Sequence, residues 1–595
     1  MVKTGVAFED YISKGEEKRK NWNYGDQDQG NPERSYFLPL FLIVLFLILF
    51  VRIFYLQVIK GYYYRYLSDN NRTKTVVVHA PRGIIFDRNG VPLVYNVPGF
   101  RENVKGKTVF LSQDEALSLI AKGKNDLEVD SLREYPYKED FSHVLGYIGQ
   151  ISKEELAMPQ YSNYLPTDPI GKEGIEQEYE TKLKGIDGKE LYEVDVKGNI
   201  VRKLGEDDPI PGQNITLTLD AKLQQVVFNA SKDIKKGSVI VSNPKGEILA
   251  LISKPSFDPN LFTMGQNYKP SSQSSYLNLS DILLDSNNQP LLDRSISGVY
   301  PPGSTFKLIV ASAGLTDKII DENWQIEDTG ILKIGDFSFS NWYYTDYGGK
   351  DGEVNIVKGI KRSNDIFFYK LAEKVGVDKI SEMAKKFGLG EKLGIDLAGE
   401  QPGTVPTPEW KLINIDEQWY LGDTYHYGIG QGYLLVTPLQ VNGWTQVIAN
   451  SGTLYKPHLL KDLGEQILAS NLLDQHSSDL IREGMIEACS PGGVAWPLFN
   501  FTVKNKNLPI DNKNFTAVAS ASADTRHVVI ACKTGTAENG SGNTLPHAWI
   551  TLFAPAYNPQ IIVTILSENS GEGSNVAAPI AKQILDDWFS REKNQ

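Results

Sequence analysis

Ser304 and Lys307 lie three residues apart at the start of an apolar stretch, in the segment YPPGSTFKLIVASAGL. A serine hydroxyl is a poor nucleophile until a base removes its proton, and residues i and i+3 share one face of a helix. The preceding residues 301–303 (PPG) break the chain and place Ser304 at a helix N-terminus, where free backbone N–H groups favour an oxyanion. Lys307 can be the base if burial near other cations keeps it neutral. The pair predicts acyl transfer through a serine ester.

The same spacing occurs a second time, at Ser242 and Lys245, so spacing alone is a weak signal. Pro244 stands between these two residues, and the segment GSVIVSNPKGEILALISK that contains them predicts a hairpin with its turn at Asn243 to Gly246. A hairpin turn cannot supply the helix geometry, so we assign this second match a structural role.

The second motif, Ser363-Asn364-Asp365, precedes the apolar segment IFFYKLAEKVG. Two interpretations are open. Ser and Asp both cap helices well, so the motif fits a helix N-cap. With the first motif present, Ser363 can instead relay a proton between Lys307 and an amine, while Asp365 accepts a hydrogen bond from a substrate amide or from Lys307.

The third motif, Lys533-Thr534-Gly535-Thr536, falls on a predicted strand. A strand can pair with an extended peptide substrate through backbone hydrogen bonds. Gly535 leaves room for close approach, and Lys533 with Thr534 or Thr536 can hold a terminal carboxylate. The backbone N–H of Thr536 is the expected second oxyanion donor beside that of Ser304.

The composition of the chain argues against several classes of function and of site. The chain of 595 residues has a net charge of -12, which argues against nucleic-acid binding. Its seven histidines form no metal-binding motif, and we expect no cofactor and no metal. Cys489 and Cys532 are the only cysteines, which we expect to be small buried hydrophobic residues. The alternative is that they pair, and because Cys532 directly precedes Lys533, pairing or oxidation could affect the site.

Residues 36–58 are long and apolar enough to cross a bilayer if Arg52 reaches the interface. The run starts late and no small-residue cleavage pattern follows, which favours an uncleaved single-pass anchor over a signal peptide. Residues 1–35 are polar and predict a disordered cytoplasmic tail. Basic residues beside the span agree weakly with that orientation, which places the C-terminal part outside the cytoplasmic (inner) membrane.

The remainder predicts two domains with a boundary near residues 209–212, where the segment PIPG occurs. Residues 59–211 predict an extended, β-rich, non-catalytic domain with one helix at 113–122. For residues 212–595 we predict a strand at NITLTLD, a helix capped by Asp220, three strands near the end and a closing helix with Pro579 in its first turn. The fold class is therefore α+β, with an antiparallel sheet flanked by helices.

The three motifs in this order closely resemble those of class B penicillin-binding proteins. The resemblance extends from about Arg52 to the C-terminus and includes the segments RIFYLQVIKG, APRGIIFDRNGVPL, HVLGYIG, GKEGIEQEYETKLKG, LTLDAKLQ, GEILALISKPSFDPN and GIGQGYLLVTPLQV. The last segment, with HAWITLFAP and SNVAAPIAKQIL, is most similar to the elongation type, penicillin-binding protein 2. The resemblance implies a β-lactamase-like serine-transpeptidase domain on a pedestal or dimerisation-type domain.

It also implies a peptidoglycan D,D-transpeptidase acting in lateral wall synthesis and cell-shape maintenance. Ser304 would attack the D-Ala-D-Ala bond of a stem peptide and expel the last D-Ala, as a carboxypeptidase does. An amine of a neighbouring stem would then form the cross-link, and β-lactams would acylate the same serine. Implied partners are lipid-linked precursor glycan strands, a glycosyltransferase of the SEDS family and elongation-complex scaffold proteins.

The sequence departs from the family pattern in three places. Asp365 stands where many relatives have Asn, although elongation-type members often have Asp. The segment from about 97 to 135 is shorter than the usual head region that contacts partners. Some relatives carry zinc between the first two motifs, but residues 308–362 contain no Cys or His.

Three alternative functions are compatible with the same catalytic core: a division-type transpeptidase, a β-lactamase or β-lactam sensor, and a non-catalytic scaffold. A lactamase would need a base for its deacylating water, for which Glu400 in GIDLAGEQPG is a candidate. We assign Glu400 a structural role because its whole loop matches the transpeptidase pattern. A scaffold would not need the complete set of catalytic groups.

Overall fold

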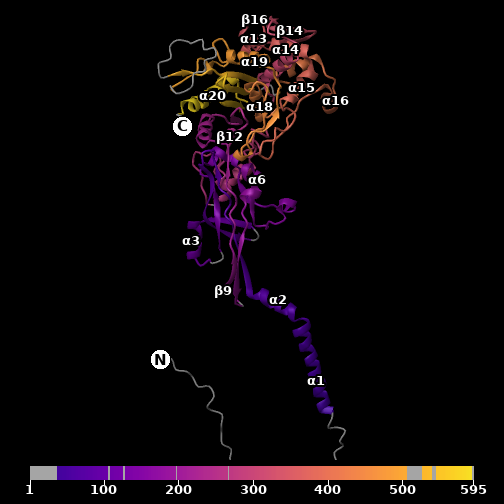
Figure 1. Ribbon diagram of the computed structural model, residues 1–595, viewed down its shortest axis with the longest axis vertical. Coiled ribbons are helices and arrows are strands. Elements are labelled where there is room, and N and C mark those ends of the chain that lie inside the picture. The colour runs from indigo at the N-terminus through magenta and orange to yellow at the C-terminus, as the bar shows by residue number, and fades with distance from the viewer. Residues whose placement is uncertain are drawn as a thin grey trace, which may run out of the picture. The chain divides into compact units, whose positions relative to one another are not determined.

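The computed structural model describes residues 37–591 except 105–106, 125–126, 196, 266, 506–524, 539 and 541–543 (Figure 1). The predicted tail, residues 1–35, lies outside the described residues. The chain divides into two compact units, Met1–Val76 with Glu190–Glu206, and Val77–Lys189 with Asp207–Gln595.

The first unit contains one continuous apolar helix. Helix α1 (Phe37–Phe54) runs into the π-helical turn η2 (Tyr55–Ile59), and together they are long and apolar enough to cross a membrane. None of its residues is buried, as expected for a lipid-facing span rather than a core helix. Helix α2 (Gly61–Arg72) follows and leads into a three-stranded sheet of order β1-β8-β9 (Thr73–Val78, Gly188–Val194 and Ile200–Asp207).

The second unit begins with a five-stranded N-terminal sheet of order β10-β2-β3-β4, with β5 also paired to β3. The helix expected at 113–122 is α3 (Gln113–Ala121), which starts with a capping box between Ser112 and Glu115. The strand expected at NITLTLD is only two residues long in the structure. Beyond it, Leu217 N still donates to the Phe86 oxygen of β2 at 2.8 Å, and Leu217 also bridges Leu460. The strands are β2 (Ile85–Phe86), β3 (Pro92–Val104), β4 (Lys107–Ser112), β5 (Glu128–Glu134) and β10 (Ile215–Thr216).

Short elements continue from the N-terminal sheet and enclose a buried ion network. Glu176, with no exposed surface, accepts hydrogen bonds from Arg82 Nη2 at 2.8 Å and from Arg133 Nε at 2.7 Å. Glu180 is a second partner of Arg82, also at 2.8 Å. The short elements are η3 (Lys138–Phe141), α4 (Ser142–Leu145), β6 (Ile148–Gln150), α5 (Lys153–Leu156), η4 (Pro159–Tyr161), β7 (Pro169–Gly171), α6 (Gly174–Glu178) and α7 (Glu180–Leu183).

Replacing Glu176 by Ala is expected to destabilise this region strongly, because both buried guanidinium groups lose a partner. Breaking a buried ion pair typically costs about 3–5 kcal/mol. Hydrogen exchange of strands β3 and β5 measures the change in opening free energy. Glu382→Ala is the control, since Glu382 forms an exposed pair with Lys386 and its loss should cost about 0.5 kcal/mol. Equal effects of the two variants would contradict the prediction.

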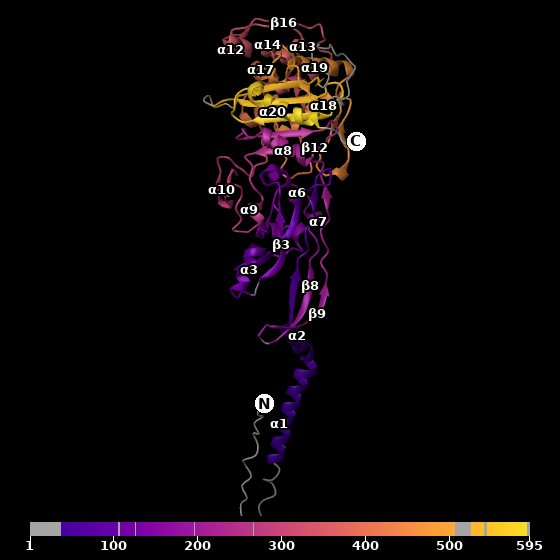
Figure 2. The same ribbon diagram turned by 90° about the vertical axis from the view of Figure 1, so that its left-hand side faces the viewer.

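The C-terminal sheet is fully antiparallel, in the order β12-β11-β23-β22-β21, which agrees with the expected α+β class. Its side chains alternate between two hydrophobic clusters, as a sheet buried on both faces requires. Helices α8 and α20 cover one face, with α20 crossing in front of the sheet in Figure 2, and α18 packs on the other. The bounds are β11 (Gly237–Ser242), β12 (Ile248–Lys254), β21 (Ala531–Ala537), β22 (His547–Ala554), β23 (Ile561–Ser567), α8 (Ala221–Ala230), α18 (Pro438–Ala449) and α20 (Gly573–Ser590).

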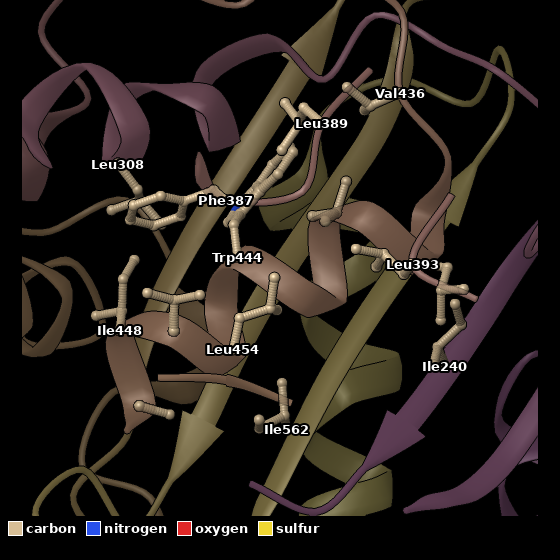
Figure 3. Packing of buried hydrophobic residues seen from close by; sticks show 14 of the residues in the cluster. Ile240, Leu308, Phe387, Leu389, Leu393, Val436, Trp444, Ile448, Leu454 and Ile562 are labelled. Carbon is tan, nitrogen blue, oxygen red and sulfur yellow. The ribbon is translucent and has the colours of Figure 1, made fainter. Parts of the chain in front are cut away.

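Helix α18 is buried along its whole length and forms the centre of the core. Trp444 extends from it toward Phe387 and Leu308, while Ile240 and Ile562 face it from the sheet (Figure 3). This packing fixes the helical layer above the sheet. That layer and its connections comprise β13 (Ile326–Asp328), β14 (Ile331–Ile334), β15 (Phe337–Ser340), α12 (Trp342–Tyr347), β16 (Gly352–Val354), α13 (Ile356–Arg362), α14 (Asp365–Val375), α15 (Val377–Lys386), α16 (Pro408–Ile415), α17 (Leu421–Gly428), β17 (Leu454–Tyr455), η6 (Lys461–Leu463), β18 (Ile467–Ala469) and α19 (Gln475–Ala488). Two short helices pack in a separate small cluster with Tyr147, namely α9 (Asn260–Thr263) and α10 (Leu279–Leu284). On the α20 side of the sheet lie η7 (Trp496–Leu498) and the strand pair β19 (Thr502–Val503) and β20 (Arg526–His527).

The ends of two helices test the sequence expectations. Asp220 caps α8 as expected, its side chain accepting from Leu223 N at 2.8 Å. The closing helix, however, starts at Gly573, so Pro579 lies inside it rather than in its first turn. A Cβ at Gly573 would lie 2.0 Å from the carbonyl oxygen of Trp549, so only glycine allows this earlier start against the sheet.

Candidate active site

Ser304 lies in the first turn of its helix, as predicted. The 3₁₀ turn η5 (Gly303–Phe306) leads directly into α11 (Lys307–Thr316). Gly303 has φ +53°, and a Cβ there would lie 2.6 Å from the carbonyl oxygen of Thr536. The backbone before Ser304 therefore touches the third motif, which brings the two expected oxyanion donors into one region.

Lys307 is completely buried beside the second motif. Its Nζ donates to Asp365 Oδ1 at 2.6 Å and to the Ser363 carbonyl oxygen at 2.7 Å, and it lies 3.4 Å from Ser363 Oγ. The structure thus brings the lysine of the first motif to both polar side chains that the sequence analysis selected in the second.

Lys533 reaches the same serine from the third motif. Its Nζ, also without exposed surface, donates to Ser363 Oγ at 2.8 Å and to the Thr534 carbonyl oxygen at 2.9 Å. The Ser363 hydroxyl therefore lies between two lysine amines. This placement differs from the expectation that Lys533 binds a terminal carboxylate, because its amine is already enclosed by protein atoms.

Burial lowers the pKa of both lysines in this cluster. Burial disfavours the ammonium form of Lys307 and lowers its pKa, against an opposing effect of Asp365. For Lys533, burial first and repulsion by Lys307 second hold the pKa well below its usual value. One carboxylate cannot compensate two buried ammonium groups, so the site favours a neutral amine.

The backbone of the second motif explains which residue caps the helix. Ser363 ends α13 in the left-handed region, with φ +52°. The N-cap of α14 is Asn364, whose side chain accepts from Phe367 N at 2.8 Å. The capping interpretation therefore holds for Asn364 alone, and the side chains of Ser363 and Asp365 are left to contact the lysines.

Residues that the sequence analysis missed hold Asp365 in place. Asp365 Oδ2 accepts from the backbone N of Trp342 at 2.9 Å, and Asp365 N donates to the Asn341 side chain at 3.2 Å. Asn341 and Asn364 each donate to Asp328 Oδ2 at 2.8 Å. Both oxygens of Asp365 are thus bound within the protein. No motif marks this network in the sequence.

The third motif occupies strand β21, which pairs with β22 and, among the described residues, with no other strand of its sheet. Thr536 is exposed and Thr534 is nearly buried. A Cβ at Gly535 would lie 3.0 Å from both the Pro302 oxygen and the Thr305 side chain. Gly535 therefore allows β21 to approach the turn that carries Ser304, rather than a substrate alone.

The two rival candidates have structural partners elsewhere. Ser242 Oγ donates to Asn442 at 2.7 Å, and Lys245 pairs with Glu465 at 2.8 Å. The serine and lysine of the second S-x-x-K match therefore bind different partners and do not form a catalytic pair. Glu400 is buried and its two carboxylate oxygens accept from the backbone of Leu393 and Gly394, at 2.6 and 2.9 Å. The Glu400 carboxylate therefore stabilises the loop in which it lies.

Cys489 and Cys532 form a disulfide across 43 residues of sequence. Of the two alternatives in the sequence analysis, the structure shows the paired form. The bond joins the C-terminal end of α19 to β21, one residue before Lys533. Helix α19 also packs on α13, which ends at Ser363. One helix thus supports the elements that carry the second and third motifs.

Reduction of this disulfide is expected to lower the free energy of unfolding by about 2–4 kcal/mol, since the bond restricts a long loop in the unfolded chain. Chemical denaturation with and without reductant measures the difference. The double variant Cys489→Ser, Cys532→Ser should show the same loss and no response to reductant. Two free thiols in protein denatured without reductant would contradict the paired state.

Comparison with known proteins identifies the family. Residues 237–586 match the penicillin binding protein transpeptidase domain, and residues 115–217 match the penicillin-binding protein dimerisation domain. The chain belongs to the class B penicillin-binding proteins. It is 33% identical to the peptidoglycan D,D-transpeptidase MrdA of Acinetobacter baumannii, over 94% of this chain and 88% of the relative.

Two solved structures resemble this class B penicillin-binding protein over most of their length. The Helicobacter pylori penicillin-binding protein PBP2 in complex with MreC is 27% identical, with a TM-score of 0.70 over 87% of this chain and 98% of that one. A chain from a peptidoglycan synthase complex, described as coordinating polymerization and crosslinking, is 26% identical, with a TM-score of 0.68 over 95% and 100%.

Proposed function

We propose that this chain is a peptidoglycan D,D-transpeptidase in which Ser304 is the nucleophile and Lys307 its base. The observation that carries the assignment is the Ser363 hydroxyl between two buried amines, one from each flanking motif. Two lysines with lowered pKa and one hydroxyl between them form a route for a proton. Family membership and the similarity to MrdA supply the substrate class.

In the first half-reaction the Ser304 oxygen attacks the carbonyl carbon of the penultimate D-Ala of a stem peptide. Its proton passes to Lys307 and then through Ser363 to the nitrogen of the leaving D-Ala, whose C–N bond breaks. The backbone N–H groups of Ser304 and Thr536 stabilise the oxyanion, a contribution typically of about 10²–10³ in rate for one donor.

In the second half-reaction an amine of a neighbouring stem attacks the serine ester. The same groups work in reverse: the amine loses a proton through Ser363 to Lys307, and Ser304 regains one as the ester bond breaks. Asp365 holds Lys307 in place. Lys533 keeps the Ser363 hydroxyl oriented, and its charge, when present, opposes protonation of Lys307.

The donor peptide binds along the edge of β21 by strand addition. The hydroxyls of Thr534 and Thr536 receive its terminal carboxylate. Lys533 does not contact that carboxylate, because its amine is buried against Ser363 and Thr534.

The apolar helix at 37–59 is the single-pass membrane anchor, with the second unit outside the cytoplasmic membrane. Residues 59–211 form the pedestal and 212–595 the transpeptidase domain. Elongation of the lateral wall is the role that the similarity to MrdA and PBP2 favours over division. A SEDS-family glycosyltransferase would supply the glycan strand from lipid-linked precursor, and a scaffold protein would bind the pedestal.

The test uses the full-length protein in detergent with a fluorescent penicillin and with a pentapeptide donor. We expect one label per chain, slow loss of the label, and release of D-Ala that an added amine acceptor diverts into cross-linked product. Rapid turnover of the penicillin would favour the lactamase alternative. Absence of labelling would refute a serine acyl-enzyme.

A further inference from the structure

Tyr300 lies four residues before Ser304, and its backbone and ring are fixed by other elements. Its backbone exchanges two hydrogen bonds with Val436, both of 2.9 Å. Its ring makes T-shaped contacts with the rings of His547 and Trp549 on β22, with centroids 5.6 and 6.3 Å away. The side chain is therefore held between the helical layer and the C-terminal sheet.

The hydroxyl of Tyr300 donates a hydrogen bond to a charged acceptor. It donates to Glu568 Oε1 at 2.7 Å, and Arg294 Nε donates to the same oxygen at 2.7 Å. The Arg294 side chain is almost fully buried, and its other nitrogens bind the carbonyl oxygens of Asn288 and Gln289. Hydrogen bonds to a charged group that is itself fixed are stronger and better oriented than neutral ones.

The chain between Tyr300 and Ser304 is short and stiff. Pro301 and Pro302 have restricted φ angles, so they transmit the placement of Tyr300 along the chain. The Pro301 carbonyl oxygen accepts from Trp549 Nε1 at 3.1 Å, and Gly303 N donates to the Gly430 oxygen at 2.9 Å. A small rotation of Tyr300 would therefore move the Ser304 oxygen.

We propose that Tyr300 and Glu568 are positioning residues for the Ser304 nucleophile. The hydrogen bond between them fixes the backbone position of the residues that lead into η5. The serine oxygen therefore keeps one orientation relative to the Lys307 amine and the oxyanion donors. Neither residue contacts the reacting atoms. The inference rests on the proposed function in that it takes Ser304 as the nucleophile.

Tyr300→Phe tests this role because it keeps the ring and deletes only the hydroxyl. Rapid-quench labelling of full-length protein with a fluorescent penicillin separates the dissociation constant of the first complex from the acylation rate constant. We expect acylation to slow about tenfold, within the range seen for small misplacements of reacting groups, while the dissociation constant and the melting temperature stay unchanged. Glu568→Gln keeps an acceptor oxygen but removes its charge, so it should slow acylation less than Tyr300→Phe, and the double variant should add little, since both changes act on one interaction.

Tyr425→Phe is the matched control, because Tyr425, which is fully buried where Tyr300 is partly buried, likewise donates to a glutamate, Glu373, at 2.8 Å. Its acylation rate should equal that of the wild type. An unchanged acylation rate in Tyr300→Phe would overturn the inference and leave the proposed function intact. So would a loss accompanied by an equal fall in melting temperature in both tyrosine variants. Failure of the wild type to label would overturn the proposed function itself, and the inference with it.

Discussion

Ser304→Ala is expected to abolish labelling by penicillin and release of D-Ala, with a fall in rate of at least about 10³-fold. The change removes a single oxygen from a half-buried position in η5, so the fold should be kept. Gel fluorescence after incubation with labelled penicillin, together with a chromatographic assay of released D-Ala, measures both steps.

Ser242→Ala is the matched control for that experiment. Ser242 has the same spacing to a lysine but binds Asn442 in the core, away from any buried lysine amine that the structure describes. It should label like the wild type. Residual labelling of Ser304→Ala at a normal rate would mean that another residue carries the acyl group, and would refute the assignment.

The sequence was sufficient for the three motifs because each carries its own local geometry. The segment PPG before Ser304 predicts a helix start, and the short, mostly apolar run HAWITLFAP predicts a strand. The candidate membrane span was equally evident from a long apolar run, found at Phe37–Ile59 against the expected 36–58. These features depend on neighbours in sequence, and local reasoning is adequate for them.

Features that depend on distant contacts were not predictable in the same way. The early start of α20 requires that Gly573 meet the Trp549 backbone. The orientation of Lys533 toward Ser363 rather than toward substrate follows from the packing of β21 against η5. No periodic pattern in the sequence indicates these contacts between residues that are far apart in the chain.

The support of Asp365 shows the same limit within the site. Asn341 and Asp328 are polar residues of ordinary composition that become buried partners of the second motif only when β13 and α12 meet α14. Their role is visible in hydrogen bonds and burial. From sequence alone, the helix N-cap and the proton relay were both reasonable interpretations of the second motif. In the structure Asn364 caps α14, while the side chains of Ser363 and Asp365 contact the lysines.

Replacing Lys307 distinguishes a base from a mere positive charge. Lys307→Met keeps the volume of the side chain and removes the amine, so acylation should slow by about 10²–10⁴-fold, the usual contribution of a general base. Lys307→Arg keeps the charge but cannot become neutral, so it should be equally slow. Rapid-quench labelling with fluorescent penicillin gives the rate constants, and Lys245→Met, in the second S-x-x-K match, is the control.

The pH dependence gives the sharper distinction. In the wild type the reactive form is the neutral amine, so the acylation rate should rise with pH and level off above the folded-state pKa of Lys307. That pKa lies below the ordinary value of 10.5, because burial outweighs the attraction of Asp365. In Lys307→Arg this rise should be absent. If Lys307→Arg retained the wild-type rate and pH profile, the lysine would serve only as a charge, and Ser304 would need another base within the cluster around Ser363.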